Sequence, residues 1–195
     1  ILQGEGMKKN IGSLLGWYAA GFILGIIGAN LLFKETGCSS GLLAIYGTAA
    51  QKELVNAEVL FKYLLFQRGA YFLFMLLIGL TYIGSFTVIL SLLWFGFLGG
   101  NLLTLFVLEF GLKGLGIGVI CSMPQIIFYL PGWLLLFWIV IRMSRKSWAK
   151  GKRERADYQA YIFFGVGACV CILLGIWLES YVNQKILVWI FQHWI

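Results

Sequence analysis

Residues 69–141 read GAYFLFMLLIGLTYIGSFTVILSLLWFGFLGGNLLTLFVLEFGLKGLGIGVICSMPQIIFYLPGWLLLFWIVI. Only two of these 73 residues, Glu109 and Lys113, carry a charge. A bilayer core about 30 Å thick is crossed by roughly 20 apolar residues in a helix, so the stretch holds enough residues for several crossings. It predicts a bundle of membrane-spanning helices joined by very short connections.

The composition of the whole chain agrees with a membrane protein. Charged residues make up 12% of the 195 residues, whereas an average soluble domain has roughly 25%. The eight Trp, nine Tyr and 25 Gly suit membrane helices, which use aromatic rings at their interfaces and Gly for close packing. The length leaves room for one membrane domain and no sizeable soluble domain. We therefore expect an all-α integral membrane protein with a single polytopic domain, residues 1–195.

Five apolar runs are predicted to cross the membrane. The first follows Lys8 and Lys9 and exceeds the roughly 7–15 apolar residues of a signal peptide, so we expect it to be retained as an anchor. Residues 69–110 are too many for one span and suit two, with Gly84 and Ser85 as the best turn between them. The predicted spans are 11–33, 69–86, 87–110, 114–141 and 159–178.

Residues 34–68 form the longest segment of mixed polarity. Apolar residues recur in it at helical spacing, and Glu58 and Lys62 form an i, i+4 pair of opposite charge on another face. The segment predicts an amphipathic helix on the membrane surface, with a helix packed on the bundle as the alternative. We expect a further short interfacial helix in the aromatic-rich tail, residues 185–195.

The loop before the last span indicates the orientation. The positive-inside rule assigns residues 142–155 to the cytoplasm together with Lys8 and Lys9, which requires an even number of intervening spans. The five-span prediction meets this condition. It leaves the N-terminus cytoplasmic and places the amphipathic segment and the C-terminus outside. The loop contains one acid, Glu154, and seven cations: Arg142, Arg145, Lys146, Lys150, Lys152, Arg153 and Arg155.

The net charge of +7 has the same explanation. Nine of the fifteen Lys and Arg residues lie on the predicted cytoplasmic side, where they orient the protein and meet anionic membrane lipid. No folded soluble domain remains to present them to a nucleic acid. We therefore expect membrane lipid and no nucleic acid among the partners.

The chain offers no catalytic or metal-binding pattern. Its one histidine, His193, stands near the C-terminus, away from the predicted spans in which a Ser–His or Cys–His pair would have to lie. No zinc-protease, α/β-hydrolase or P-loop motif occurs. Cys121, Cys169 and Cys171 lie within apolar runs, and Cys38 stands alone outside them. Cys169 and Cys171 are two residues apart, on different sides of a helix, so they cannot bind one ion together. We expect no enzyme, no catalytic residue, no metal site and no cofactor.

Polar and small residues within the spans are the remaining candidates for a functional site. Asn101 follows Gly96, Gly99 and Gly100, a pattern that predicts close helix packing with interhelical hydrogen bonding. Small residues four apart also form three motifs that put two glycines on one helix face. These are Gly12-x3-Gly16, Gly21-x3-Gly25 and Gly114-x3-Gly118. Such faces serve packing within the chain or pairing with another membrane protein, a homo-oligomer included, and the sequence leaves both open.

Two further groups of candidates are a pair of charged residues between two spans and a set of prolines within the span 114–141. Glu109 and Lys113, at i, i+4 across Gly111, are predicted to form an ion pair at the outer surface. Pro124 and Pro131 each remove a backbone donor from the span 114–141 and predict kinks. Gln125 can satisfy a freed carbonyl, and a broken helix of this kind also occurs in transporter binding sites.

Several stretches together carry a wider pattern: FGFLGG at 95–100, EFGLKG at 109–114, PQ at 124–125, YLP at 129–131 and ESYVN at 179–183. In order and spacing they resemble the stage II sporulation protein M family. ESYVN resembles that family's E-x-Y-V-N/T-P ending after the last span, although Gln184 stands where proline is expected. The resemblance covers roughly residues 10–185.

The resemblance implies a non-enzymatic scaffold in a bacterial cell membrane, in the septal or engulfing membrane of the mother cell. Its implied partners are membrane-anchored peptidoglycan hydrolases, stage II sporulation proteins D and P, which it recruits during engulfment of the forespore. A small-solute transporter or channel subunit lined by Gln125, Asn101 and Glu109 is the alternative. The candidate packing or partner-interface residues are Gly96, Gly99, Gly100, Asn101, Glu109, Gly111, Lys113, Gly114, Pro124, Gln125, Pro131 and Glu179.

Overall fold

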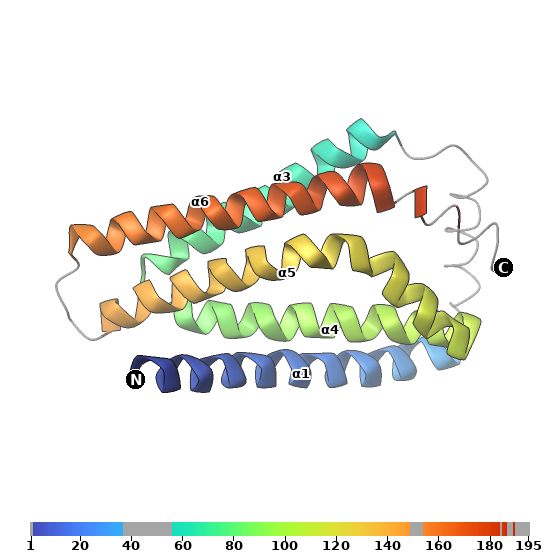
Figure 1. Ribbon diagram of the computed structural model, residues 1–195. Helices are drawn as coiled ribbons and strands as arrows, with labels where there is room; N and C mark the ends of the chain where they lie inside the picture. The colour runs from blue at the N-terminus through green and yellow to red at the C-terminus, as the bar shows by residue number, and fades with distance from the viewer. Residues whose placement is uncertain (1, 37–55, 149–153, 184, 187–188, 190–195) are drawn as a thin grey trace. The chain divides into compact units, whose positions relative to one another are not determined.

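The computed structural model describes residues 2–36, 56–148, 154–183, 185–186 and 189. Within them the chain is helical and contains no strand (Figure 1). Five helices in this described part are long and apolar enough to cross a membrane, which agrees with the prediction of an all-α protein with five helices of membrane-spanning length. The helices are α1 (Leu2–Thr36), α3 (Ala57–Gly79), α4 (Gly84–Phe110), α5 (Leu112–Trp148) and α6 (Arg155–Leu178), and α6 continues into a π-helix, η1 (Glu179–Asn183).

All five apolar spans overlap runs expected from the sequence, and the second departs most from its expected bounds. Helix α3 begins at Ala57 and ends at Gly79, whereas the run was predicted over 69–86. The side chain of Asn56 caps α3 by accepting a hydrogen bond from the Glu58 backbone N–H at 3.1 Å. The apolar windows are Gly12–Leu31, Ala57–Gly79, Gly84–Leu108, Met123–Trp148 and Arg155–Asn183.

The early start of α3 corrects the prediction of a separate surface helix. Residues 57–66 form the first part of α3, while residues 37–55 of the expected segment and most of the tail 185–195 lie outside the described residues. The predicted span began at residue 69, where the nearly uncharged run starts directly after Arg68. In the structure Arg68 pairs with Glu179 at 2.8 Å, so the charge is compensated and the helix continues.

The turn between α3 and α4 also differs from its predicted place. It occupies residues 80–83, and Gly84, expected in the turn, begins α4. The Thr81 hydroxyl donates to the Ile78 carbonyl at 2.7 Å and closes the end of α3. A Cβ at Gly84 would lie 3.1 Å from the Gly79 Cα and 3.2 Å from the Ser144 Cβ. Gly84 therefore allows a close approach of neighbouring elements.

Ser144 of α5 fastens this turn. Its hydroxyl donates to the Tyr82 carbonyl at 3.0 Å and accepts the Ser85 backbone N–H at 3.1 Å. The indole N–H of Trp148 donates to the same Tyr82 carbonyl at 2.6 Å. Ser144 is fully buried. A side chain from another helix thus satisfies one of the backbone donors that a helix start leaves free.

The contacts divide the chain into two compact units, each described on its own: the α1–α4 unit, residues 1–45 and 89–119, and the α3–α5–α6 unit, residues 46–88 and 120–195. The predicted single domain stays a prediction. In the α3–α5–α6 unit, α3 runs beside α6 (Figure 1). The largest fully buried side chains of that unit include Met75, Leu136, Phe137 and Ile176.

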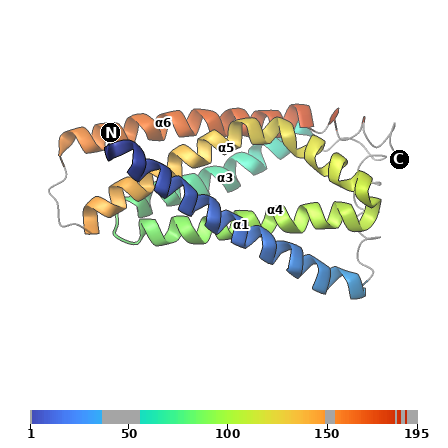
Figure 2. The ribbon, with the colours of Figure 1, turned by 60° about the horizontal axis from the view of Figure 1, so that its bottom comes forward.

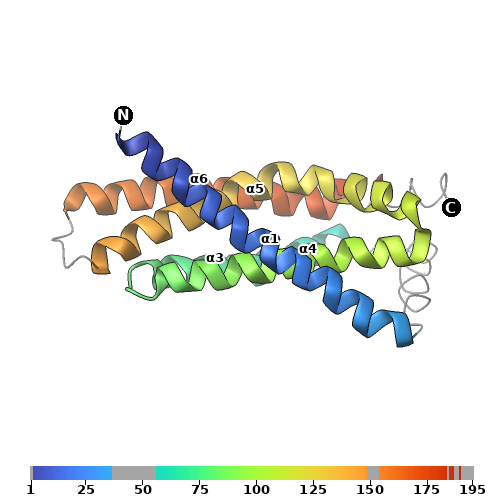
Figure 3. The same ribbon diagram turned by 90° about the horizontal axis from the view of Figure 1, so that it is seen from below.

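In the α1–α4 unit, α1 crosses α4, as Figures 2 and 3 show. Two glycines from each helix make the crossing close. A Cβ at Gly21 or Gly25 would collide with a backbone carbonyl oxygen of α4, and a Cβ at Gly96 or Gly100 with one of α1. The two backbones therefore touch without intervening side chains, as small-xxx-small faces permit.

A single residue separates α4 from α5. Gly111 has φ +61°, the left-handed conformation in which glycine carries no steric penalty. Beyond it, a Cβ at Gly114 would collide with the carbonyl oxygen of Phe106, and one at Gly118 would lie 3.2 Å from the Phe106 ring. These two glycines let the start of α5 pack against the end of α4.

Candidate functional site

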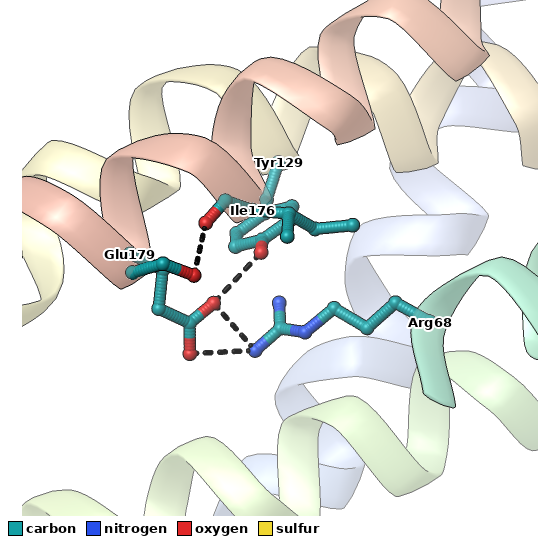
Figure 4. A network of polar contacts seen from close by, with 5 residues as sticks. Arg68, Tyr129, Ile176 and Glu179 are labelled. Atoms are coloured by element: carbon teal, nitrogen blue, oxygen red, sulfur yellow. Dashed lines mark hydrogen bonds and ion pairs between the residues drawn. The ribbon is translucent and has the colours of Figure 1, made fainter. Parts of the chain in front are cut away.

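Three polar side chains from distant parts of the chain meet in the α3–α5–α6 unit (Figure 4). The Arg68 guanidinium lies 2.9 Å and 2.8 Å from the two carboxylate oxygens of Glu179. The Tyr129 hydroxyl donates to the same carboxylate at 2.7 Å. The Arg68 Cζ also stands 4.2 Å from the centre of the Tyr129 ring. Each member thus contacts both others, and we call Arg68, Tyr129 and Glu179 the polar triad.

Three different elements position the triad. Arg68 comes from the middle of α3, Tyr129 from α5 and Glu179 from the first residue of η1. The Tyr129 ring is buried and lies against Gly175, where a Cβ would approach the ring to 2.7 Å. Gly175 therefore leaves the space that lets the Tyr129 hydroxyl reach the Glu179 carboxylate.

The π-helix η1 carries the Glu179 carboxylate, and its other residues are fixed by a hydrogen bond and by packing. The Ser180 hydroxyl donates to the Ile176 carbonyl at 2.9 Å, and Ser180 is 1% exposed. The Tyr181 ring lies 6.2 Å from that of Phe61 in α3. Asn183 is buried too, and its side-chain oxygen has no hydrogen-bond partner within the described residues. Short π-helical turns within a helical run are often found at functional sites.

The charges and hydrogen bonds of the triad favour a structural role over a catalytic one. One positive and one negative charge meet, so the pair carries no net charge in a low-dielectric setting. Both carboxylate oxygens are engaged, by a charged donor and by a phenol, and such charge-assisted bonds are the stronger kind. Arg68 and Glu179 retain 29% and 18% side-chain exposure, so the pair lies at the edge of the packed interior. This arrangement can fix three elements together.

The glycines predicted from the sequence fall into two groups. Gly96 and Gly100 lie on the α1 backbone, while Gly99 faces the flexible Tyr18 side chain, whose hydroxyl would lie 3.2 Å from an added Cβ. In contrast, a Cβ at Gly12 or Gly16 would meet nothing within 4 Å. The same Gly-x3-Gly spacing therefore lies on a packed face of α1 at Gly21 and Gly25 and on an open face at Gly12 and Gly16.

The polar candidates predicted from the sequence make fewer hydrogen bonds than the triad does. Asn101 and Gln125 each have a buried side-chain oxygen without a hydrogen-bond partner among the described residues. The interhelical hydrogen bond expected for Asn101 is therefore not formed by that oxygen. Pro124 and Pro131 both lie inside α5, which is one helix from Leu112 to Trp148, and the kinks expected at these prolines stay a prediction.

The predicted surface ion pair remains a prediction. The side chain of Glu109 lies outside the described part of the chain, and Lys113 is exposed near the start of α5. Gly111, between them, forms the link between α4 and α5. Within the described ranges no three His, Cys, Asp or Glu side chains gather as a metal site would need.

Two members of the triad were missing from the predicted site. Arg68 lies just before the span predicted from residue 69, and Tyr129 belongs to the predicted pattern only as part of the YLP stretch. A signal for Arg68 did exist, because an ionisable residue beside a long apolar run calls for a partner. Glu179 was the one triad residue among the candidates.

Comparisons of the chain with protein-family models, curated proteins and solved structures found no match.

Proposed function

We propose that this protein is a non-enzymatic, multi-pass membrane scaffold similar to the stage II sporulation protein M family. In this role it would recruit membrane-anchored peptidoglycan hydrolases, stage II sporulation proteins D and P, during engulfment of the forespore. The observation that carries the proposal is the meeting of Tyr129 and Glu179. They belong to two stretches, YLP and ESYVN, that resemble the family, and they join through a hydrogen bond between residues 50 positions apart.

The triad supports a holding role rather than a reactive one. A general acid or base must exchange its proton with a substrate, and both oxygens of Glu179 already accept hydrogen bonds from protein groups. The same bonds tie η1 to α3 and α5. We therefore assign the triad to keeping that end of the unit rigid, so that a partner meets a fixed surface.

The orientation inferred from the sequence predicts on which side of the membrane η1 and the start of α3 lie. With the N-terminus and residues 142–155 in the cytoplasm, the start of α3 and η1 face the outside, where wall hydrolases act. The family resemblance implies the location, a bacterial cell membrane, in the septal or engulfing membrane of the mother cell.

The start of α3 provides a surface for a partner. Val59, Tyr63 and Phe66 recur at i, i+4 and i+7 and are 60%, 61% and 80% exposed, so they form one apolar stripe. An exposed stripe of this kind suits a helix or an anchor segment of another membrane protein. We call these three residues the α3 stripe and assign hydrolase recruitment to it.

Copurification from detergent tests the assignment. Tyr63→Ala/Phe66→Ala should lose both hydrolases when the protein is extracted from sporulating cells at matched membrane levels. Tyr158→Ala/Phe163→Ala is the matched control, because it removes the same two side-chain types from exposed positions near the start of α6. Equal capture by both double variants would refute recruitment through the α3 stripe. Deletion of the whole protein should stall engulfment, seen with a membrane dye.

One observation favours a transporter or channel subunit as the second candidate. Gln125, next to a proline inside α5, keeps a buried side-chain oxygen that no described residue binds, and such a group can contact a solute. The variant Gln125→Leu separates the two. A scaffold should still capture the hydrolases and support engulfment, whereas a complete loss of engulfment with capture intact would favour a transport pathway.

The orientation is tested with single cysteines at positions 48 and 150, in a background without the four native cysteines. We expect an impermeant thiol reagent to label Thr48→Cys but not Lys150→Cys in intact cells, because residues 142–155 are assigned to the cytoplasm. Both positions lie outside the described residues. Labelling at position 150 would show that the orientation is the opposite one, with the α3 stripe on the cytoplasmic side, away from the cell wall.

A further inference from the structure

A groove lies between α5 and α6, where α5 ends and α6 begins. It is shallow, with a cavity volume of about 20 Å³, and is lined by side chains of both helices. Its polar wall includes Arg142 and Lys146 of α5 and Asp157 of α6, and its apolar wall includes Trp138 and Phe164. It belongs to the α3–α5–α6 unit but shares no residue with the polar triad.

The charges of the groove do not cancel. Lys146 forms an ion pair with Asp157, whose other oxygen accepts the Glu154 backbone N–H at 3.2 Å. The positive charge of Arg142 also attracts the Asp157 carboxylate, but Arg142 makes no ion pair within the described residues, and its side chain is exposed. Its guanidinium lies 5.5 Å from the centre of the Trp138 ring. Two cations thus share one carboxylate, and the groove carries a net positive charge.

The polarity of the groove changes along the helices. Arg142 and Lys146 stand in the last two turns of α5, while Trp138 lies one turn deeper and meets the Phe164 ring edge-on at 5.3 Å. A cation near a helix end with an aromatic ring below it is the arrangement that proteins place at the headgroup level of a bilayer. An acyl chain suits the aromatic wall, and a phosphate suits the guanidinium.

We propose that this groove binds one anionic phospholipid, with its phosphate on Arg142 and its acyl chain along Trp138 and Phe164. The uncompensated cation selects for negative charge, and the aromatic wall selects a lipid over a soluble phosphate. The seven cations of residues 142–155 would raise the local concentration of anionic lipid around the site. The proposal does not depend on the scaffold role.

Native mass spectrometry of the purified protein tests this with phosphatidylglycerol and phosphatidylcholine as probes. We expect the protein to retain phosphatidylglycerol in preference to phosphatidylcholine. The variant Arg142→Gln should weaken phosphatidylglycerol binding about tenfold or more, since it removes a hydrogen bond between two charged groups. Arg145→Gln is the matched control: the same charge is lost from an exposed position that does not line the groove, and the general attraction of a surface cation accounts for at most about fivefold.

A gain-of-binding variant adds an independent test. Asp157→Asn releases Lys146 while an amide oxygen can still accept the Glu154 N–H, so phosphatidylglycerol binding should tighten. Equal losses in Arg142→Gln and Arg145→Gln would overturn the site in favour of general attraction to the basic helix end. Equal retention of the two lipids, weaker binding by a normally melting Asp157→Asn, or displacement of the lipid by an equal concentration of inorganic phosphate would also overturn it.

Discussion

The α1–α4 unit and the α3–α5–α6 unit hold their helices together by different contacts. In the first, Gly21 and Gly25 face Gly96 and Gly100, and the backbones of α1 and α4 touch directly. In the second, side chains reach across: Arg68 and Tyr129 bind Glu179, and the Tyr161 hydroxyl donates to the Leu76 carbonyl of α3 at 2.8 Å.

The difference follows from the environment of membrane helices. Lipid tails are as apolar as leucine, so burying apolar area gives little drive for helices to associate. Two other sources remain, namely dispersion contacts between closely approaching backbones and polar bonds between side chains. The glycine contact demands the absence of side chains, whereas the polar contact demands particular ones. The two units should therefore respond to opposite kinds of substitution.

The largest expected effect is in the α1–α4 unit. Gly100→Ala would place a Cβ against the Phe22 carbonyl oxygen, a backbone atom that moves only with its helix. We expect a loss of about 3 kcal/mol in stability, the upper range for overpacking, or failure to accumulate in the membrane. Thermal melting in detergent, followed by size-exclusion chromatography, measures it.

The neighbouring glycine supplies the control for this prediction. Gly99→Ala adds the same methyl group but meets side-chain atoms rather than backbone, namely the Tyr18 hydroxyl at 3.2 Å and the Phe22 ring at 3.8 Å. We expect at most about 1 kcal/mol of change, within the usual range of tolerated core substitutions. If both variants melt alike, the backbone contact between α1 and α4 does not limit stability.

An intermediate effect is expected in the α3–α5–α6 unit. Glu179→Gln keeps the shape of the side chain but removes its charge, which weakens the bonds to Arg68 and Tyr129. Hydrogen bonds to charged groups contribute about 1.5–3 kcal/mol, and because this pair is partly exposed we expect a loss at the lower end, about 1.5 kcal/mol. A double-mutant cycle with Arg68→Met isolates the pair. Strict additivity in that cycle would show that the triad does not couple the helices.

The smallest effect is expected from a polar residue in the glycine-packed unit. The Asn101 side-chain oxygen has no partner among the described residues, so Asn101→Leu removes no hydrogen bond at that atom. We expect a change of no more than about 0.6 kcal/mol, the average for one hydrogen bond between membrane helices. A loss several times larger, in the same melting assay, would mean that polar side chains also hold the α1–α4 unit.

The helical class and the number of spans could be predicted because they depend on local sequence. An apolar run of about 20 residues identifies a span wherever its neighbours lie. The start of α3 could not be predicted in this way. Whether Arg68 ends a span depends on Glu179, 111 positions later in the chain, and no local pattern reports that partner.

The same limit applies to the glycine motifs and to the site. Gly12-x3-Gly16 and Gly21-x3-Gly25 have identical spacing, yet only the second faces a backbone of α4. Spacing predicts a face, and the fold decides whether a partner occupies it. Likewise, Glu179 could be selected as a candidate from its sequence context, but Tyr129 joins it only because Gly175 leaves room for the ring.

The hydrogen bond from the Ser85 N–H to the Ser144 hydroxyl has a consequence for biosynthesis. It joins residues 59 positions apart, and a chain is made from its N-terminus onward. When the α3–α4 hairpin first enters the membrane, α5 has not yet been synthesised, so water or lipid headgroups must satisfy Ser85 and Tyr82 in its place. Insertion of α5 then completes the hairpin, and a ribosome pause before residue 144 would leave it open.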